Sequence, residues 1–289
     1  PLFVKLLVDH VRKGRPRSGV VMDQGTQGAA DRGYTQETLG APLGATAGAH
    51  GRDVGRLDSG WKFFKGNQDQ AYQTAYDDSA WQSVSIPHDW AIEGPFIKEG
   101  DGNTGKLPWK GEGWYRKKLS LSDQDKGKRI YLLFDGVMAF PKVYVNGKLA
   151  GSWDYGYNSF YLDITELIQY SADNILAVHA DTRKHDSRWY PGAGIYRKVQ
   201  LIAVDPVHAE LWGTQITTPV IKPHHAEVRI NSSIKNSSSE QREIVVKHII
   251  YSTDKRMLQE QRDTVQIPGN SIRMAENTIT EGLKRRNHE

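Results

Sequence analysis

The sequence predicts an all-β protein made of two successive β-sandwiches. Short apolar or alternating runs recur along most of the chain, and Gly, Pro, Asn and Asp separate them at close intervals, as strands and turns require. Only residues 164–170 suggest a helical turn, which Asp163 or Thr165 could cap. With 289 residues, the chain is long enough for about two ordinary domains.

Residues 1–56 are predicted to be an irregular or non-native leader. They contain no Trp and one Tyr but many Gly, Ala, Arg and Thr residues, so they bury too little apolar surface to offset the entropy cost of ordering. The segment also lacks an initiating Met. We interpret it as vector-derived, out-of-frame or linker sequence and exclude it from the fold, with a functional N-terminal arm as the alternative.

Residues 57–205 predict a jelly-roll sandwich. The continuous apolar run at 129–134 indicates a buried strand, whereas residues 142–145 alternate between polar and apolar. Asn146-Gly147 follows and is the strongest short signal for a hairpin. The remaining strands are expected at residues 148–151, 174–179 and 196–201. Many short strands with almost no helix are typical of a sandwich of this size.

Residues 206–289 predict an immunoglobulin-like sandwich. No Trp occurs after Trp212, and residues 226–231 and 243–250 alternate with period two on either side of a polar turn at 236–239. The fold usually needs about 100 residues. The segment is shorter and ends in a polar tail, so we predict that this second sandwich is incomplete.

The composition argues against several classes of function. The net charge of +4 is small and its charges are interspersed, so nucleic-acid binding is not expected. No apolar stretch reaches the ~20 residues that span a bilayer, and no signal peptide is visible. We therefore expect a soluble protein. Cys is absent, which leaves the compartment undecided between bacterial cytoplasm and periplasm.

No cofactor and no metal site are predicted. His224 and His225 are adjacent, but no further ligands occur at useful spacing around them.

Four sequence segments occur in an order and spacing that, taken together, are specific enough to indicate a protein family. They are Ser85–Trp90 (Ser-Ile-Pro-His-Asp-Trp), Gly113–Arg116 (Gly-Trp-Tyr-Arg), the series 134–137, 143–147, 155–160 and 163–165, and Ser187–Arg197 (Ser-Arg-Trp-Tyr-Pro-Gly-Ala-Gly-Ile-Tyr-Arg). The chain thereby resembles the family 2 glycoside hydrolases, notably the β-galactosidases. The resemblance implies a sugar-binding jelly roll, then an immunoglobulin-like domain, then a (β/α)₈ barrel that carries both catalytic glutamates.

The barrel of that family is not predicted here. Such a barrel needs ~250 residues beyond the two sandwiches, and the sequence ends before them. No carboxylate of this chain can therefore be assigned to the family's acid/base or nucleophile position.

Sugar-binding residues are predicted on two loops. Sugars need polar partners for their hydroxyls and aromatic rings for their C–H faces, and Asp186, Arg188, Trp189 and Tyr190 supply both on one loop. The alternative is that Arg188 pairs with a carboxylate and Trp189 fills the core. Asn103 lies in a Gly-rich loop, Asn103-Thr104-Gly105, that resembles the loop by which some family members contact the substrate; the alternative is a plain turn.

Three functions compete. The first is a carbohydrate-binding and scaffolding region of a family 2 glycoside hydrolase, without the catalytic barrel. The second is a stand-alone β-glucosidase or β-galactosidase, which would need a new carboxylate pair about 5 Å apart or wider. Its weak candidates are Asp89, Glu93, Asp135 and Asp186. The third is a lectin-like interaction module.

Two sets of side chains test these expectations. Nine residues are predicted to be buried in the first sandwich: Trp61, Trp81, Trp90, Phe134, Val143, Val145, Ile175, Val178 and Ile195. Six aromatic residues are expected on a surface that lacks its barrel: Trp109, Trp153, Tyr155, Tyr157, Trp189 and Tyr190. That surface should form an aromatic groove or cause self-association into a homo-oligomer.

Overall fold

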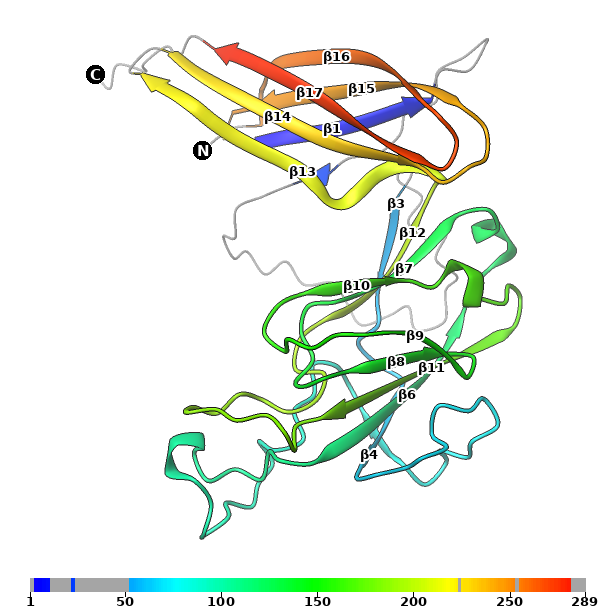
Figure 1. The fold of residues 1–289 in the computed structure, drawn as a ribbon, viewed down its shortest axis with the longest axis vertical. Coiled ribbons are helices and arrows are strands. Elements are labelled where there is room, and N and C mark those ends of the chain that lie inside the picture. The colour runs from blue at the N-terminus through cyan, green and yellow to red at the C-terminus, as the bar shows by residue number, and fades with distance from the viewer. Residues whose placement is uncertain (1–2, 11–21, 24–51, 223–224, 253–254, 282–289) are drawn as a thin grey trace. The chain divides into compact units, whose positions relative to one another are not determined.

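The computed structural model describes residues 3–10, 22–23, 52–222, 225–252 and 255–281, and almost all of its regular secondary structure is strand (Figure 1). The strands are β1 Phe3–His10, β2 Met22–Asp23, β3 Arg52–Arg56, β4 Trp61–Lys65, β5 Gln82–Val84, β6 Glu112–Ser120, β7 Arg129–Phe134, β8 Lys142–Val145, β9 Lys148–Ser152, β10 Phe160–Asp163, β11 Asp173–Asp181, β12 Val199–Val204, β13 Val207–Lys222, β14 His225–Asn236, β15 Arg242–Tyr251, β16 Met257–Ile267 and β17 Ser271–Glu281. Three single turns of 3₁₀ helix are η1 Gly102–Thr104, η2 Asp123–Asp125 and η3 Thr165–Leu167. The all-β prediction is confirmed.

The first sandwich comprises residues 53–203. Its larger sheet has the order β5-β4-β6-β11-β8-β9, and its smaller sheet has the order β10-β7-β12-β3. Side chains from both sheets fill one core that includes Trp61, Tyr115, Phe134 and Val178. The Asn146-Gly147 turn joins β8 to β9 as predicted, and both of its residues have positive φ, as a tight hairpin turn requires.

The outer face of the larger sheet carries a second apolar cluster. Trp81 and Trp114 are buried there with Ala71 and Ala177, beneath the segment 66–81. The guanidinium of Arg116 holds this segment, because it donates to the Asp78 carboxylate at 2.7 Å and to the carbonyls of Ala71, Gln73 and Tyr76. A fully buried arginine is tolerated here because its donors are satisfied.

Eight of the nine residues predicted to be buried are buried, and Ile175 is half-buried. Along β11 the even positions, Asn174 to Ala180, face the core. Successive side chains of a strand point to opposite faces, so Ile175 and Val178 could not both point inward.

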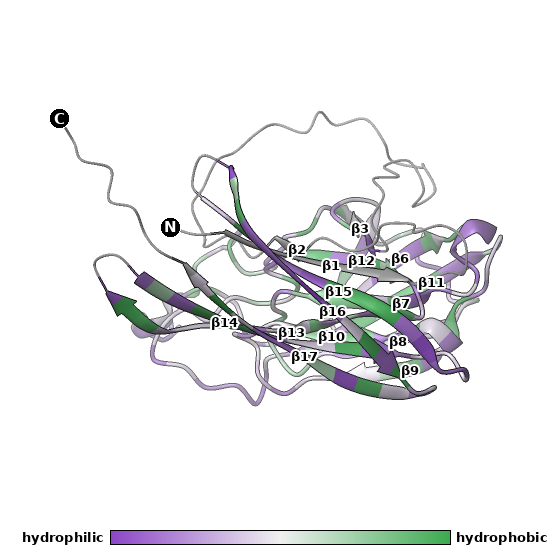
Figure 2. Cartoon of the chain, turned by 90° about the horizontal axis from the view of Figure 1, so that it is seen from above, coloured by the Kyte–Doolittle hydropathy of each residue, from purple (hydrophilic) through white to green (hydrophobic). Residues whose placement is uncertain are grey.

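The second sandwich comprises residues 204–281 together with β1 and β2. One sheet has the order β13-β14-β17, and the other has the order β16-β15-β1-β2. Alternation of apolar and polar residues is visible along its strands (Figure 2). The inward residues are mostly Ile and Val, among them Ile230, Ile234, Ile244 and Val246.

The prediction of an irregular leader is wrong at the three described segments 3–10, 22–23 and 52–56, which are strands. Residues 3–10 form β1, which pairs antiparallel with β15 in a register from Phe3 opposite Tyr251 to His10 opposite Ile244. Residues 52–56 form β3 at the edge of the smaller sheet of the first sandwich. Their low aromatic content gave no indication of strands. A strand that joins an existing sheet is also stabilised by backbone hydrogen bonds, which do not depend on aromatic side chains. Residues 11–21 and 24–51 lie outside the described part of the chain.

Candidate functional site

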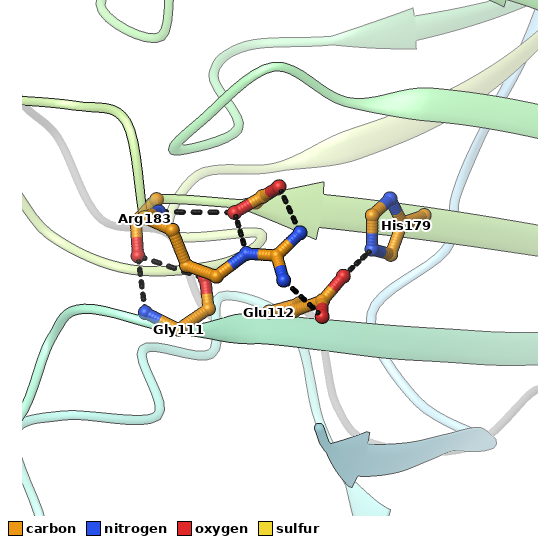
Figure 3. A network of polar contacts seen from close by, with 6 residues as sticks. Gly111, Glu112, His179 and Arg183 are labelled. Atoms are coloured by element: carbon orange, nitrogen blue, oxygen red, sulfur yellow. Dashed lines mark hydrogen bonds and ion pairs between the residues drawn. The ribbon is translucent and has the colours of Figure 1, made fainter. Parts of the chain in front are cut away.

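The predicted sugar-binding loop, residues 182–190, begins where β11 ends, and a polar network holds its base (Figure 3). The Arg183 guanidinium lies 2.8 Å from Glu112 Oε1 and 2.8 Å from Asp181 Oδ2. The other oxygen of Glu112 lies 3.0 Å from His179 Nε2. The Thr182 backbone N–H donates to the Gly111 carbonyl at 2.8 Å. The loop therefore leaves the sheet in a fixed direction.

The far end of the loop is tied to the Pro87-His-Asp-Trp90 motif. The Tyr190 hydroxyl donates to Asp89 Oδ1 at 2.6 Å, and the same oxygen accepts from the Ala91 N–H at 3.0 Å. Burial, together with the negative Asp89 carboxylate, raises the pKa of Tyr190 far above its usual value. The Tyr190 hydroxyl therefore stays protonated and Asp89 acts here as an acceptor that positions the loop.

Exposed aromatic rings gather beside this loop. Trp189 and Tyr155 are each 59% exposed, and Tyr157, half-buried, lies between them with ring centroids 6.5 Å from Trp189 and 5.6 Å from Tyr155. Trp189 Nε1 donates to the Tyr157 hydroxyl at 2.9 Å, which fixes both rings. A pocket of about 450 Å³ opens here, lined by Tyr157, His185, Asp186, Ser187, Arg188 and Trp189.

The charged groups of this pocket have different partners. The Asp186 carboxylate accepts from Lys110 Nζ at 2.7 Å, and this bond lowers the pKa of Asp186. Burial lowers the pKa of His185, which favours its neutral form. Arg188 is exposed and has no ion pair with any described residue. Trp189 is 59% exposed and so does not fill the core, and Arg188 has no carboxylate partner among the described residues.

A second, smaller pocket of about 290 Å³ lies on the other side of Asp186 and Ser187, which line both pockets. Thr104, Trp109 and Lys110 are also in its wall. Asn103 is exposed and belongs to η1, where its backbone N–H donates to Asp101 Oδ1 at 2.9 Å. The loop of Asn103 therefore reaches the Asp186 loop, although Asn103 itself lines neither pocket.

The four weak catalytic candidates differ in setting. Asp89 is bound to Tyr190, and Asp186 is bound to Lys110. Glu93 is exposed. Asp135 directly follows β7 in the sequence and is half-buried, and its backbone N–H donates to the Lys198 carbonyl at 2.9 Å. Whether any two of them act as an acid and a nucleophile stays a hypothesis.

The six aromatic residues expected at the surface behave differently. Trp153, Tyr155 and Trp189 are exposed, Tyr157 and Tyr190 are half-buried, and Trp109 is buried at 5% exposure beside Lys110. Tyr157 is expected from the sequence only as part of the aromatic surface, and His185 and Lys110 are not expected at the site. The Tyr155-Gly-Tyr157 pattern is a sequence signal that indicates Tyr157. No sequence pattern indicates Lys110, because its role depends on a contact with Asp186, which is 76 residues away in the sequence.

Residues 67–190 match the family model described as glycosyl hydrolase 2 galactose-binding domain-like. The chain resembles the N-terminal part of the family 2 glycoside hydrolases. It is 36% identical over 216 residues to β-galactosidase BoGH2A of Bacteroides ovatus, which covers 74% of this chain and 25% of that protein. A β-glucuronidase of Formosa agariphila is 29% identical over 243 residues, covering 76% of this chain and 25% of that protein.

Solved structures agree with this family resemblance. A β-glucuronidase of Bacteroides uniformis superposes with a TM-score of 0.74 and 29% identity, covering 81% of this chain and 28% of that one. A family 2 member from Bacteroides cellulosilyticus gives a TM-score of 0.75 with 29% identity, covering 80% and 31%. The chain spans about a quarter of the length of the curated relatives it matches.

The described residues contain no (β/α)₈ barrel, the part that carries both catalytic glutamates in the family 2 glycoside hydrolases. Among those same residues, no helix is long and apolar enough to cross a membrane. The described residues also contain no cluster of three or more His, Cys, Asp or Glu side chains that could hold a metal ion. Of the adjacent pair His224 and His225, His224 lies outside the described residues.

Proposed function

We propose that this region is a carbohydrate-binding and scaffolding module of a family 2 glycoside hydrolase, and that it binds β-glycosides in the pocket beside Trp189. The observation that carries this proposal is the hydrogen-bonded pair of exposed Trp189 and half-buried Tyr157 next to Arg188 and Asp186. Flat apolar rings with convergent polar groups are the surroundings that sugar rings require.

The loop geometry supports binding in a second way. The network at Arg183 holds one end of the loop, and the Tyr190–Asp89 bond holds the other. A site that is ordered before the ligand arrives loses less conformational entropy on binding.

Titration of the purified chain with methyl β-galactoside and methyl β-glucuronide, followed by NMR and Trp fluorescence, tests the proposal. We expect saturable binding that Trp189→Ala weakens at least fivefold. Trp212→Ala is the matched control, because Trp212 is also half-exposed (52%) but belongs to the second sandwich. Absence of binding to both sugars, or equal loss in the two variants, would overturn the proposal.

The competing function, hydrolysis by the sandwiches themselves, is tested in the same preparation. Release of the aryl group from aryl β-glycosides by highly purified chain, compared with an Arg188→Ala variant, would show it. We expect no turnover above the solvent rate, because the family's catalytic glutamates belong to the barrel.

A further inference from the structure

The second sandwich contains a strand, β1, that precedes the first sandwich in the sequence (Figure 1). Strands β13, β14 and β17 form one sheet, and β15 lies between β16 and β1 in the other. In the immunoglobulin fold the first, second and fifth strands share one sheet, and the third strand shares the other with the sixth and seventh. Because β15 is the third strand of the series β13–β17, β1 takes the place of the sixth strand and β2 that of the seventh. Both pairs are antiparallel, as in that fold.

The register of β1 fits the core of this sandwich. Val4 lies opposite Ile250 and Val8 lies opposite Val246, and both of these β15 residues are fully buried. Residues that oppose each other across an antiparallel ladder belong to the same face of the sheet, so these apolar positions of β1 fall in the inward phase of β15. The eight consecutive pairs have no register shift. A slip by one residue would place polar positions of β1 in that phase instead.

The strand ladder is what joins β1 to this sandwich. Among the described residues, β1 pairs with β15 and β2, and the next strand along the chain is β3, which belongs to the first sandwich. No short connection links β1 to β15. An element of this kind makes the same contacts whether it comes from its own chain or from a second copy, which is the basis of domain swapping.

We propose that β1 is a donor strand that two copies of this chain exchange, so that the edge of β15 in each copy accepts β1 of the other. Without β1, the edge of β15 would present a row of free N–H and C=O groups, and another strand is the partner that satisfies them. The exchange is reciprocal, so the assembly closes as a dimer. The acceptor site is therefore specific for an extended segment of eight residues with the β1 sequence.

Disulfide cross-linking tests this exchange, because the chain contains no Cys of its own. Leu7 and Lys247 are register partners, so their Cα atoms lie within the distance that a disulfide spans. A Leu7→Cys copy and a Lys247→Cys copy can be joined in register only if β1 of the first pairs with β15 of the second. The two variants, one with a tag that increases its mass, would be mixed, incubated in a glutathione redox buffer and separated on a non-reducing gel.

Val8→Cys mixed with Lys247→Cys is the matched control, because Val8 is adjacent to Leu7 in β1 and successive residues of a strand alternate between its faces. We expect about tenfold more mixed dimer from the Leu7→Cys pair, because a disulfide needs Cα atoms within about 7 Å and Cβ atoms that point toward each other. One chain that carries both Leu7→Cys and Lys247→Cys reports whether β1 and β15 pair at all.

Three outcomes overturn the proposal. The first is a disulfide that forms only within the doubly substituted chain, with no mixed dimer, because β1 then stays with its own copy. The second is equal mixed dimer from the Leu7→Cys and Val8→Cys pairs, because random collision then explains it. The third needs no substitution: light scattering that gives the mass of a monomer at every concentration of the unmodified chain.

Discussion

Both sandwiches are built from antiparallel strands, but different types of residue fill their cores. The first has an aromatic core around Trp61, Phe63 and Tyr115, and it contains seven of the eight Trp residues. The second is filled mostly by Ile and Val from β13 to β17. Strands β4 to β12 have 3–9 residues and long connections, whereas β13 to β17 have 10–16 residues. The candidate site lies in the first sandwich, on the connections that follow β9 and β11.

Each sandwich also buries strongly polar groups, and one from each serves for comparison. In the first it is Arg116, which is charged and bound to Asp78. In the second it is His248, whose Nε2 lies 2.9 Å from Ser232 Oγ and whose Nδ1 lies 2.6 Å from Asn277 Nδ2. A buried arginine must keep its charge, whereas a buried histidine can become neutral. The two sandwiches should therefore respond differently to pH and to substitution.

The largest effect is expected at the aromatic core. Trp61 is 1% exposed, and its Nε1 donates to the Leu57 carbonyl at 2.7 Å. Trp61→Ala should lower the free energy of unfolding by about 3–5 kcal/mol, since it leaves a large cavity and an unpaired carbonyl. Urea unfolding followed by Trp fluorescence and circular dichroism measures the change. A loss below about 1 kcal/mol would show that this core collapses around the vacancy.

Arg116→Met should have the next largest effect. The Asp78 carboxylate and three carbonyls lose their donor, and we expect a loss of about 3 kcal/mol. Lys118→Met is the control on the same strand, because Lys118 is exposed and its 3.7 Å contact with Asp173 is worth little. Similar losses in both variants would contradict the view that Arg116 holds segment 66–81.

The second sandwich should lose stability in mild acid. Burial lowers the pKa of His248 to about 4, against about 6.5 in an unfolded chain. Between these values the unfolded state binds more protons, so stability is complete above pH 6.5 and falls as the pH decreases. The loss from this residue at pH 5 should be about 2 kcal/mol.

Urea unfolding at pH 7.5 and pH 5, in wild type and His248→Gln, measures this contribution. The variant should show a smaller decrease than wild type, while His225→Gln on β14 should show the full decrease. His208, whose pKa burial also lowers to about 4, supplies part of the decrease that remains. An unchanged pH dependence in His248→Gln would contradict the prediction.

The smallest effect on stability is expected at the candidate site. Trp189 is 59% exposed, so Trp189→Ala should change the free energy of unfolding by less than about 0.5 kcal/mol. Measured beside Trp61→Ala, it separates a Trp that holds the core from one that is available to a ligand. A loss above 2 kcal/mol would place Trp189 among the residues that hold the fold.

Local patterns predicted the strands well where the signal lies within the strand itself or in the turn that follows it. Residues 129–134 and 142–145 match β7 and β8, because apolar runs and the Asn146-Gly147 turn act locally. The strand expected at 196–201 instead begins at Val199, after Gly194, whose φ is +95 and where a side chain would collide with the Tyr115 hydroxyl. No local pattern reports such a contact between distant segments.

The candidate site was predictable in its residues but not in its charge. The motif that contains Arg188, Trp189 and Tyr190 indicated sugar chemistry, and the structure brings Trp189 together with Tyr157. The neutralisation of Asp186 by Lys110 and the isolation of Arg188 depend on how two loops meet. Those contacts are three-dimensional, so residue order alone could not reveal them.

The pairing of β1 with β15 has a consequence for the order of assembly. Register partners run from residues 3 and 251 to residues 10 and 244, so nearly the whole chain separates the two strands. Closing so long a loop costs entropy before any contact repays it, and pairings of this kind form late. During synthesis the first sandwich can fold before β15, the partner of β1, has been made. A strand that is synthesised before the first sandwich is then paired only after it.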